Sequence, residues 1–185
     1  MSERDEWETP KWLFDILNEQ YKFTVDCCAN VKNTKVRSDF THEFENFKMI
    51  NHILWMNPPF SKANAMFKHF FKMTKCRGIA IYRCDNLETK VWQDIIFPNA
   101  SWIFIPNKRI AYEGLEGKGS RFPSALIGYK TPRPKLIKGS LLIPANQETQ
   151  QEVEIKEVAE NKTQTEDSLY TYKNLSKKEG RGREE

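Results

Sequence analysis

Short apolar runs separated by polar segments fill the first two thirds of the chain, and their spacing predicts alternating strands and helices. Runs of five to seven residues rich in β-branched and aromatic side chains are typical of buried strands. These runs are residues 23–29, 52–56, 78–83, 101–106 and 124–129. Apolar positions three and four residues apart predict helices. Three helices are predicted. The first begins at Thr9-Pro10, the second begins after Ser61, and the third spans residues 88–97.

The helix starts carry polar residues that are suited to capping. Thr9 is predicted to cap the first helix, with Pro10 in its first turn, and Ser61 is predicted to cap the second helix. In chain order the elements then alternate as strand, helix, strand, helix, strand, loop, strand. This order predicts an α/β fold with an open mixed sheet flanked by helices, in which the last strands can run antiparallel.

Two polar residues lie near the ends of predicted strands. Asp26 lies toward the end of the first strand, and Asn57 directly follows the second. Open α/β sheets bind ligands at the carboxyl ends of their strands. We therefore expect Asp26 and Asn57 on the same rim of the sheet, within one site.

The pattern changes after Tyr129, and residues 145–185 form a segment rich in Glu, Gln, Lys and Thr. One more short strand is predicted within residues 135–144, around Leu141 and Leu142. The composition of residues 145–185 cannot bury enough apolar surface to fold alone. We therefore predict a globular domain over residues 1–144 and a charged, disordered or marginally helical tail over 145–185.

The charge is unevenly distributed between these two parts. The net charge is +4, but basic residues exceed acidic ones by seven in residues 1–144, and acidic residues exceed basic ones by three in the tail. A basic globular part suits a polyanion such as DNA, and a solvated lysine-rich surface is the alternative. No apolar run reaches the 18 residues of a membrane span, and the polar start is not a signal peptide, so we expect a cytoplasmic protein.

The cysteines do not predict a metal site. They are Cys27, Cys28, Cys76 and Cys84, and no C-x-x-C pair or histidine-rich spacing accompanies them. Adjacent cysteines in an apolar run are typical of reduced, packed thiols.

The turn Asn57-Pro58-Pro59-Phe60 matches the needs of methyl transfer to an exocyclic amine. Such an amine is a poor nucleophile, because its lone pair is delocalised into the ring. The Asn57 amide oxygen and the Pro58 carbonyl can accept hydrogen bonds from its two N–H groups, and proline fixes the backbone around that carbonyl. Phe60 offers a flat face for an extruded base. The alternative is a proline-stiffened turn between strand and helix.

A basic loop between the last two long strands is the best candidate for DNA contacts. Its residues of interest are Lys108, Arg109, Tyr112, Lys118 and Arg121. Cations interleaved with an aromatic suit phosphate binding and stacking. A plain exposed hairpin loop is the alternative.

Four segments in order carry a family resemblance that covers residues 5–130. They are Trp7-Glu-Thr-Pro10, Val25-Asp-Cys-Cys-Ala29, Asn57-Pro-Pro-Phe60 and Phe122-Pro-Ser-Ala-Leu126. Together they resemble the phage-type DNA N6-adenine methyltransferases. The resemblance implies a Rossmann-like methyltransferase fold, S-adenosylmethionine as methyl donor, and adenine in DNA as substrate. It also implies a role in phage biology or restriction-modification, inside a bacterial host cell if the protein is phage-encoded.

The resemblance also assigns roles to single residues. Thr9 and Pro10 resemble the segment that contacts the methionine end of the donor, Asp26 resembles the acidic residue that pairs with its ammonium group, and Ala29 follows in that motif. No glycine-rich loop follows Asp26, which departs from larger adenine methyltransferases. The carboxylate for the donor ribose remains open among Asp39, Glu43 and Glu45. Arg83, Asp85 and Ser124 are expected near the site.

Two kinds of alternative function stay open at this point. The same turn occurs in methyltransferases that act on cytosine N4, RNA adenine or protein glutamine. A non-catalytic alternative is a DNA-binding or anti-restriction module that has kept the fold and lost the donor, and the missing glycines give it some weight. With no separate recognition domain visible, we expect a short target sequence or relaxed specificity.

Overall fold

A computed structural model describes residues 7–36, 44–46, 48, 50–113, 122–135, 137–142 and 144. Its helical elements are α1 (Lys11–Tyr21), η2 (Phe44–Asn46), η3 (Phe60–Lys62), α2 (Ala63–Lys72), η4 (Val91–Ile96) and α3 (Phe97–Asn99). Its strands are β1 (Val25–Asp26), β2 (Ile53–Met56), β3 (Arg77–Arg83), β4 (Trp102–Pro106), β5 (Ser124–Tyr129) and β6 (Gly139–Leu142). None of the described helices is long and apolar enough to cross a membrane.

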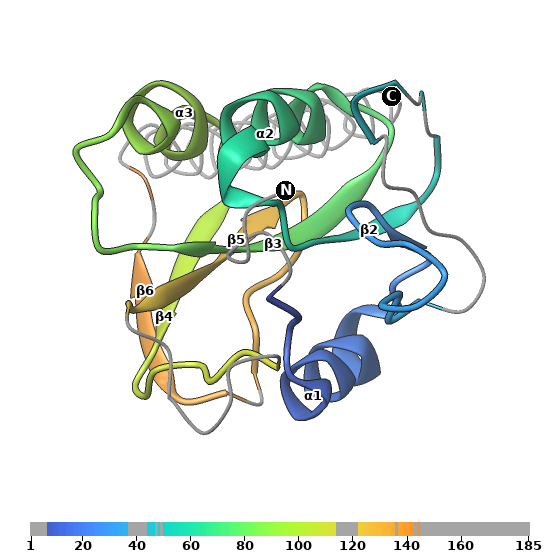
Figure 1. The fold of residues 1–185 in the computed structure, drawn as a ribbon. Helices are drawn as coiled ribbons and strands as arrows, with labels where there is room; N and C mark the ends of the chain where they lie inside the picture. Colours follow the sequence, from blue (N-terminus) through green and yellow to red (C-terminus); the bar gives the residue numbers. More distant parts are fainter. Residues whose placement is uncertain are drawn as a thin grey trace, which may run out of the picture. The chain divides into compact units, whose positions relative to one another are not determined.

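The six strands form one mixed sheet in the order β1-β2-β3-β5-β4-β6 (Figure 1). β1, β2 and β3 are parallel, whereas β5 runs antiparallel to both of its neighbours, β3 and β4. β4 therefore points in the same direction as the first three strands, and their carboxyl ends share one rim. The predicted α/β class with an open mixed sheet and antiparallel late strands is confirmed.

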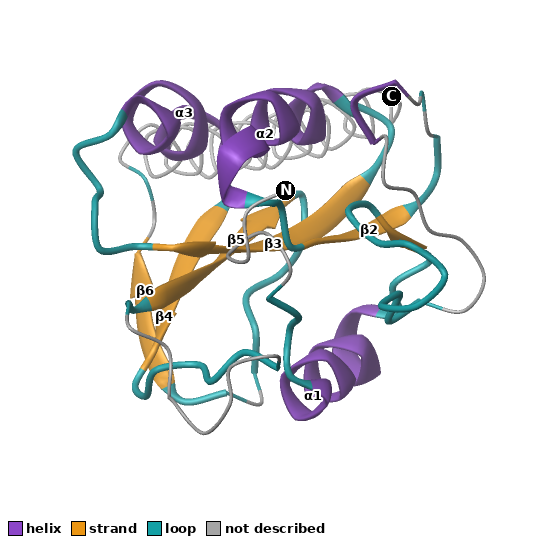
Figure 2. Cartoon of the chain, viewed as in Figure 1, coloured by secondary structure: helices purple, strands orange, loops and turns teal. Residues whose placement is uncertain are grey.

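Helices cover both faces of the sheet (Figure 2). On one face α2 buries Phe67 and Phe70 and η4 buries Trp92 against the strands. On the other face α1 buries Leu13 and Leu17 beside Trp55. Burial of apolar side chains on both faces explains why the strands read as continuous apolar runs.

Two predicted caps are wrong. α1 begins at Lys11 with Pro10 as its N-cap, and the Pro10 carbonyl accepts from Leu13 and Phe14, so Thr9 lies outside the helix. Ser61 lies inside the short turn η3, and neither η3 nor α2 has a side-chain capping hydrogen bond. In both places a proline carbonyl accepts the first hydrogen bond of the turn. At α1 the Glu113 carboxylate, and not a hydroxyl, accepts from the first backbone N–H, that of Lys11.

Some predicted bounds also shift. β1 has only two residues, because Cys27 and Cys28 already form a turn after Asp26. The helix predicted over 88–97 is a π-helical segment, Val91–Ile96, that continues into α3. Residues 145–185 lie outside the described part of the chain, so the tail and the domain boundary stay predictions.

Replacing Gly128 by alanine is expected to destabilise the protein. A Cβ atom there would lie 2.0 Å from Cε2 of Trp102, whose indole nitrogen is held by a 2.7 Å hydrogen bond to the Thr131 carbonyl. Overpacking of this kind costs about 1–3 kcal/mol, and urea denaturation measures it. In a Trp102→Phe background the cost should shrink, because the smaller ring leaves space. An equal cost in both backgrounds would contradict the steric explanation.

Candidate active site

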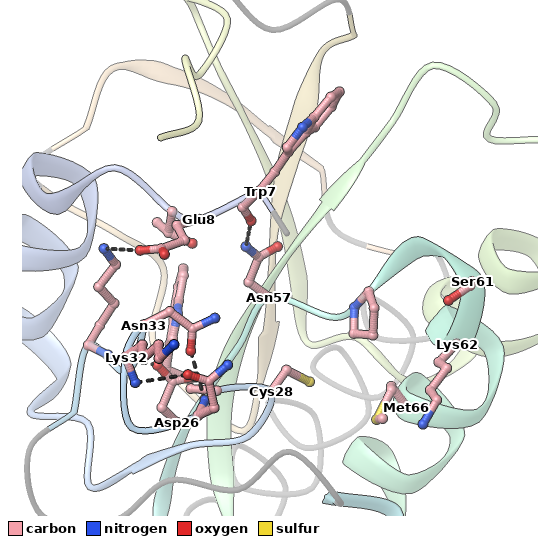
Figure 3. A pocket seen from close by; sticks show the side chains of 16 residues that line it. Trp7, Glu8, Asp26, Cys28, Lys32, Asn33, Asn57, Ser61, Lys62 and Met66 are labelled. Carbon is pink, nitrogen blue, oxygen red and sulfur yellow. Dashed lines mark hydrogen bonds and ion pairs between the residues drawn. The ribbon is translucent and has the colours of Figure 1, made fainter. Parts of the chain in front are cut away.

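Asp26 and Asn57 lie together on the carboxyl rim of the parallel strands, as predicted. Asp26 ends β1 and pairs in register with Trp55, and Asn57 is the first residue after β2. Both residues line a pocket of about 440 Å³ (Figure 3). The other walls come from the segment before α1, the loop after β1, the turn after β2, and α2. They include Trp7, Glu8, Thr9, Cys28, Ala29, Lys32, Lys35, Pro59, Ser61, Lys62 and Met66.

The Asn57 amide has a fixed orientation. Its Nδ2 donates a 2.9 Å hydrogen bond to the backbone carbonyl of Trp7, and Figure 3 shows the two residues facing each other. Because the amine side of the amide is engaged, the Oδ1 atom remains as an acceptor, and no described residue donates to it. A half-buried amide oxygen held in this way can accept a hydrogen bond from an amine that enters the pocket.

Phe60, the last residue of the turn, belongs to an aromatic cluster beside Asn57. Its ring meets Trp7 edge to face, with centroids 6.0 Å apart, and Phe122 in the same manner at 5.4 Å. The Arg83 guanidinium lies 4.8 Å from the centre of the Phe122 ring and 5.7 Å from that of Phe60. Hydrogen bonds of 2.7 and 2.5 Å hold Arg83 on Asp85, and they lower the pKa of that carboxyl. Arg83 thus lies against the aromatic cluster, but neither Arg83 nor Asp85 lines the pocket, and their roles in the site stay predictions.

Asp26 is a buried carboxylate in the wall of this pocket. It is 4% exposed, and its Oδ2 accepts from the Lys35 backbone N–H at 3.0 Å. Burial raises the pKa of Asp26 to about 6, although backbone hydrogen bonds from Lys35 and Cys28 oppose the shift. An ionised carboxylate in this place is short of compensating charge.

The other predicted donor residues are close by. Thr9 lines the pocket, and its buried hydroxyl oxygen has no hydrogen-bond partner among the described residues. Ala29 also lines the pocket, whereas Pro10 does not line it and is the N-cap of α1. Asp39 and Glu43, and the side chain of Glu45, lie outside the described residues. Among the described residues, no three His, Cys, Asp or Glu side chains come together in a way that could hold a metal ion.

The structure corrects the prediction for Tyr112. Its side chain is 4% exposed, and its hydroxyl hydrogen-bonds to Ser124 Oγ at 2.9 Å, so it cannot stack on DNA from an exposed loop. Burial raises its pKa. Ile110 and Tyr112 point inward, while Arg109 and Ala111 between and beside them are exposed.

Of the four basic residues predicted to contact DNA, the structure describes two. Lys108 and Arg109 are exposed just beyond β4, whose carboxyl end lies on the same rim as the pocket. Lys118 and Arg121 lie outside the described residues.

Sequence reasoning missed a charged network at the pocket. Lys35 Nζ lies 3.1 Å from Glu8 Oε2 and 2.9 Å from Glu113 Oε2. These partners are 27 and 78 residues away in the chain, so no local pattern could have indicated them. The Trp7 carbonyl was equally hidden, because a backbone atom leaves no signature in the sequence.

Comparison with known proteins gives two matches. A family model described as DNA N-6-adenine-methyltransferase (Dam) matches residues 1–182. The chain is also 29% identical over 150 residues to a protein of Haemophilus phage HP1 (strain HP1c1) named "DNA N-6-adenine-methyltransferase". That alignment covers 76% of this chain and 85% of the relative. The family match includes every segment that builds the pocket.

Proposed function

Because the chain belongs to the DNA N-6-adenine-methyltransferase (Dam) family, we infer that the pocket is the catalytic site of an S-adenosylmethionine-dependent enzyme that methylates adenine N6 in DNA. The observation that carries this assignment is the hydrogen bond from Asn57 to the Trp7 carbonyl. It presents an amide oxygen to a pocket that also holds a buried carboxylate. Neither comparison supports a non-catalytic DNA-binding module or a different methyl acceptor.

We propose that the turn after β2 activates the target amine. Asn57 Oδ1 accepts a hydrogen bond from one N–H of the adenine amino group and the Pro58 carbonyl accepts one from the other, which draws the nitrogen lone pair out of the ring. The nitrogen forms its bond to the methyl group as the bond from that group to sulfur breaks, and the methylated nitrogen then loses one proton to water. Phe60 supports the extruded base by stacking. S-adenosylmethionine, when bound, supplies a methyl group on a positively charged sulfur. No side-chain base is required before transfer, so alignment by these residues carries most of the rate.

Thr9, Pro10, Asp26 and Ala29 are the proposed donor-binding residues, and their environment fits the methionine end of the donor. A buried carboxylate with a raised pKa gains stability when an ammonium group lies opposite it. The unpartnered hydroxyl of Thr9 gains a hydrogen bond from a polar ligand atom. Ala29 leaves room for the donor because its side chain is small.

The finer fold assignment and the DNA contacts are also proposals. Parallel strands covered by helices on both faces, with the site at their carboxyl rim, support a Rossmann-like methyltransferase sheet. The exposed cations Lys108 and Arg109 lie beyond β4 on that rim, and we propose that they bind DNA phosphates together with Lys118 and Arg121. Tyr112 then supports the pocket from inside, behind Trp7 and Phe122.

A product assay tests the proposed activity. The purified chain is incubated with unmethylated duplex DNA and methyl-labelled S-adenosylmethionine, and the DNA is digested to nucleosides. We expect the label in N6-methyladenine, with little label in RNA of the same sequence. Label in N4-methylcytosine or preferentially in RNA would assign a different acceptor, and no transfer to DNA would refute the proposal.

Phe60→Ala is expected to lower kcat/KM for DNA roughly 10- to 100-fold, because stacking of one base on an aromatic ring is worth about 1–3 kcal/mol. Phe60→Tyr is the matched control, since it keeps the ring and should retain most of the activity. The donor affinity should stay unchanged in both variants, because Phe60 lies in the aromatic cluster beside Asn57 and does not line the pocket that holds Asp26. Equal activity of the alanine and tyrosine variants would show that the ring does not support the base.

A further inference from the structure

A charged network ties together three segments that are distant in sequence. The Lys35 ammonium bridges the carboxylates of Glu8 and Glu113. Glu113 uses its other oxygen, Oε1, to accept from the backbone N–H of Lys11 at 2.7 Å. Glu8 and Glu113 also pair through their backbones, with hydrogen bonds of 3.3 and 2.9 Å. The segment before α1 is thereby held in one place along the pocket.

This network touches both halves of the site. On the donor side, the Lys35 backbone N–H donates to the Asp26 carboxylate at 3.0 Å. On the acceptor side, Glu8 follows Trp7 directly, and the Trp7 carbonyl orients the Asn57 amide. Figure 3 shows Trp7, Glu8 and Asn57 along one edge of the pocket, with Asp26 below them. One residue, Lys35, is therefore linked to the donor carboxylate by its main chain and to the catalytic amide by its side chain.

We propose that Lys35 is a positioning residue for methyl transfer: its ammonium group fixes the Trp7–Glu8 segment, and so the direction in which Asn57 presents its amide oxygen. The proposal rests on the proposed function of the pocket. It assigns Lys35 no contact with either substrate. It also predicts that the two roles of Lys35 separate, because a side-chain substitution leaves the backbone contact with Asp26 intact.

The electrostatics of the network favour a geometric role over a stabilising one. The Glu8 and Glu113 side chains are 36% and 44% exposed, and ion pairs of that exposure contribute little net stability. Burial acts to lower the pKa of Lys35, but the two carboxylates outweigh it and raise the pKa above its ordinary value. Lys35 therefore stays charged at every pH at which the enzyme would be assayed.

Lys35→Met tests the proposal, with N6-methyladenine formation and donor affinity measured separately. At saturating donor we expect kcat to fall roughly 10- to 100-fold, because small misplacements of a catalytic group have effects of this size. At pH 8 the Kd for S-adenosylmethionine should stay within about twofold of wild type, because the backbone N–H that holds Asp26 is retained and the pKa of Asp26, about 6, leaves it ionised at that pH. Lys35→Arg keeps the charge and should recover most of kcat. Lys130→Met is the control for the loss of one positive charge. Lys130 follows the end of β5 that is opposite to the rim with the pocket, so the kcat of this variant should match that of wild type.

The value of kcat at saturating donor decides the outcome. A wild-type kcat in Lys35→Met, or a loss explained entirely by weaker donor binding, would overturn the positioning role. If Lys35→Met folds poorly, Glu8→Met replaces it, because that variant removes the ion pair between Lys35 and the Trp7–Glu8 segment, keeps the backbone pairing with Glu113, and should also lower kcat. Inactive wild-type protein would instead refute the proposed function. Active wild-type protein together with fully active variants would refute only the positioning role of Lys35.

Discussion

Replacing Asn57 by alanine is expected to reduce methyl transfer about 10³-fold at saturating DNA and donor. The variant loses the acceptor that draws the amine lone pair out of the ring, and removing one preorganised polar group from an active site costs about 10²- to 10³-fold in kcat. We place the effect at the upper end, because the Asn57 amide is fixed by the Trp7 carbonyl before any substrate arrives. Single-turnover formation of N6-methyladenine measures the loss.

Asn57→Asp is the informative companion variant. It keeps an oxygen acceptor but cannot donate to the Trp7 carbonyl, so the side chain loses its orientation. We expect activity between those of wild type and Asn57→Ala. The affinity for S-adenosylmethionine, measured by calorimetry, should change little in Asn57→Ala. Wild-type activity in that variant would remove Asn57 from the mechanism.

Asp26→Asn is expected to weaken donor binding by roughly 30- to 5,000-fold, because breaking a buried charge pair costs about 2–5 kcal/mol. The same interaction predicts a pH dependence. With a pKa of about 6, Asp26 is ionised above pH 6 and neutral below it, so donor affinity in the wild type should fall as the pH drops through 6. Calorimetric titration between pH 5 and 8 measures this change. Asp26→Asn should show a flatter profile over that range.

As the pH rises, the stability of the donor-free protein should fall, whereas its affinity for the donor should increase. The pKa of Asp26 is raised from its ordinary 3.8 to about 6 on folding, so its contribution to stability is greatest below pH 3.8 and is lost as the pH rises through 6. At pH 8 the buried charge costs the donor-free protein about 2–3 kcal/mol. Asp26→Asn without donor should therefore melt at or above the wild-type temperature at pH 8. A lower melting temperature with unchanged donor affinity would indicate a purely structural Asp26.

The sheet and the shared rim could be predicted because both depend on local pattern. Apolar runs mark strands whose two faces are covered, and a polar residue at the end of such a run is a local feature of Asp26 and Asn57. The helix starts were harder to predict. Thr9 and Ser61 match the preferences of capping residues, but neither caps a helix. The acceptor for the first N–H of α1 is Glu113, which is 102 residues away from Lys11 and therefore outside any local pattern.

The rest of the site depends on contacts that no short window contains. Tyr112 looked like an exposed aromatic among cations, but its backbone neighbour Glu113 pairs with Glu8, which turns the ring inward under Trp7. Lys35 looked like one more surface lysine, and only the fold places two carboxylates around it. Contacts between residues that are distant in sequence depend on the three-dimensional fold. The preferences of single residues therefore cannot predict them.

The position of β5 has a consequence for the order in which the chain can fold during synthesis. β5 fills the space between β3 and β4, yet it is made after both of them. A nascent chain that ends before residue 124 therefore carries two unpaired inner strand edges, which are sites of aggregation. Arg83 at the end of β3 also lacks its partner in the ladder, Ser124, until that moment. A ribosome-bound fragment should thus acquire protease resistance in one late step, once β5 has left the exit tunnel.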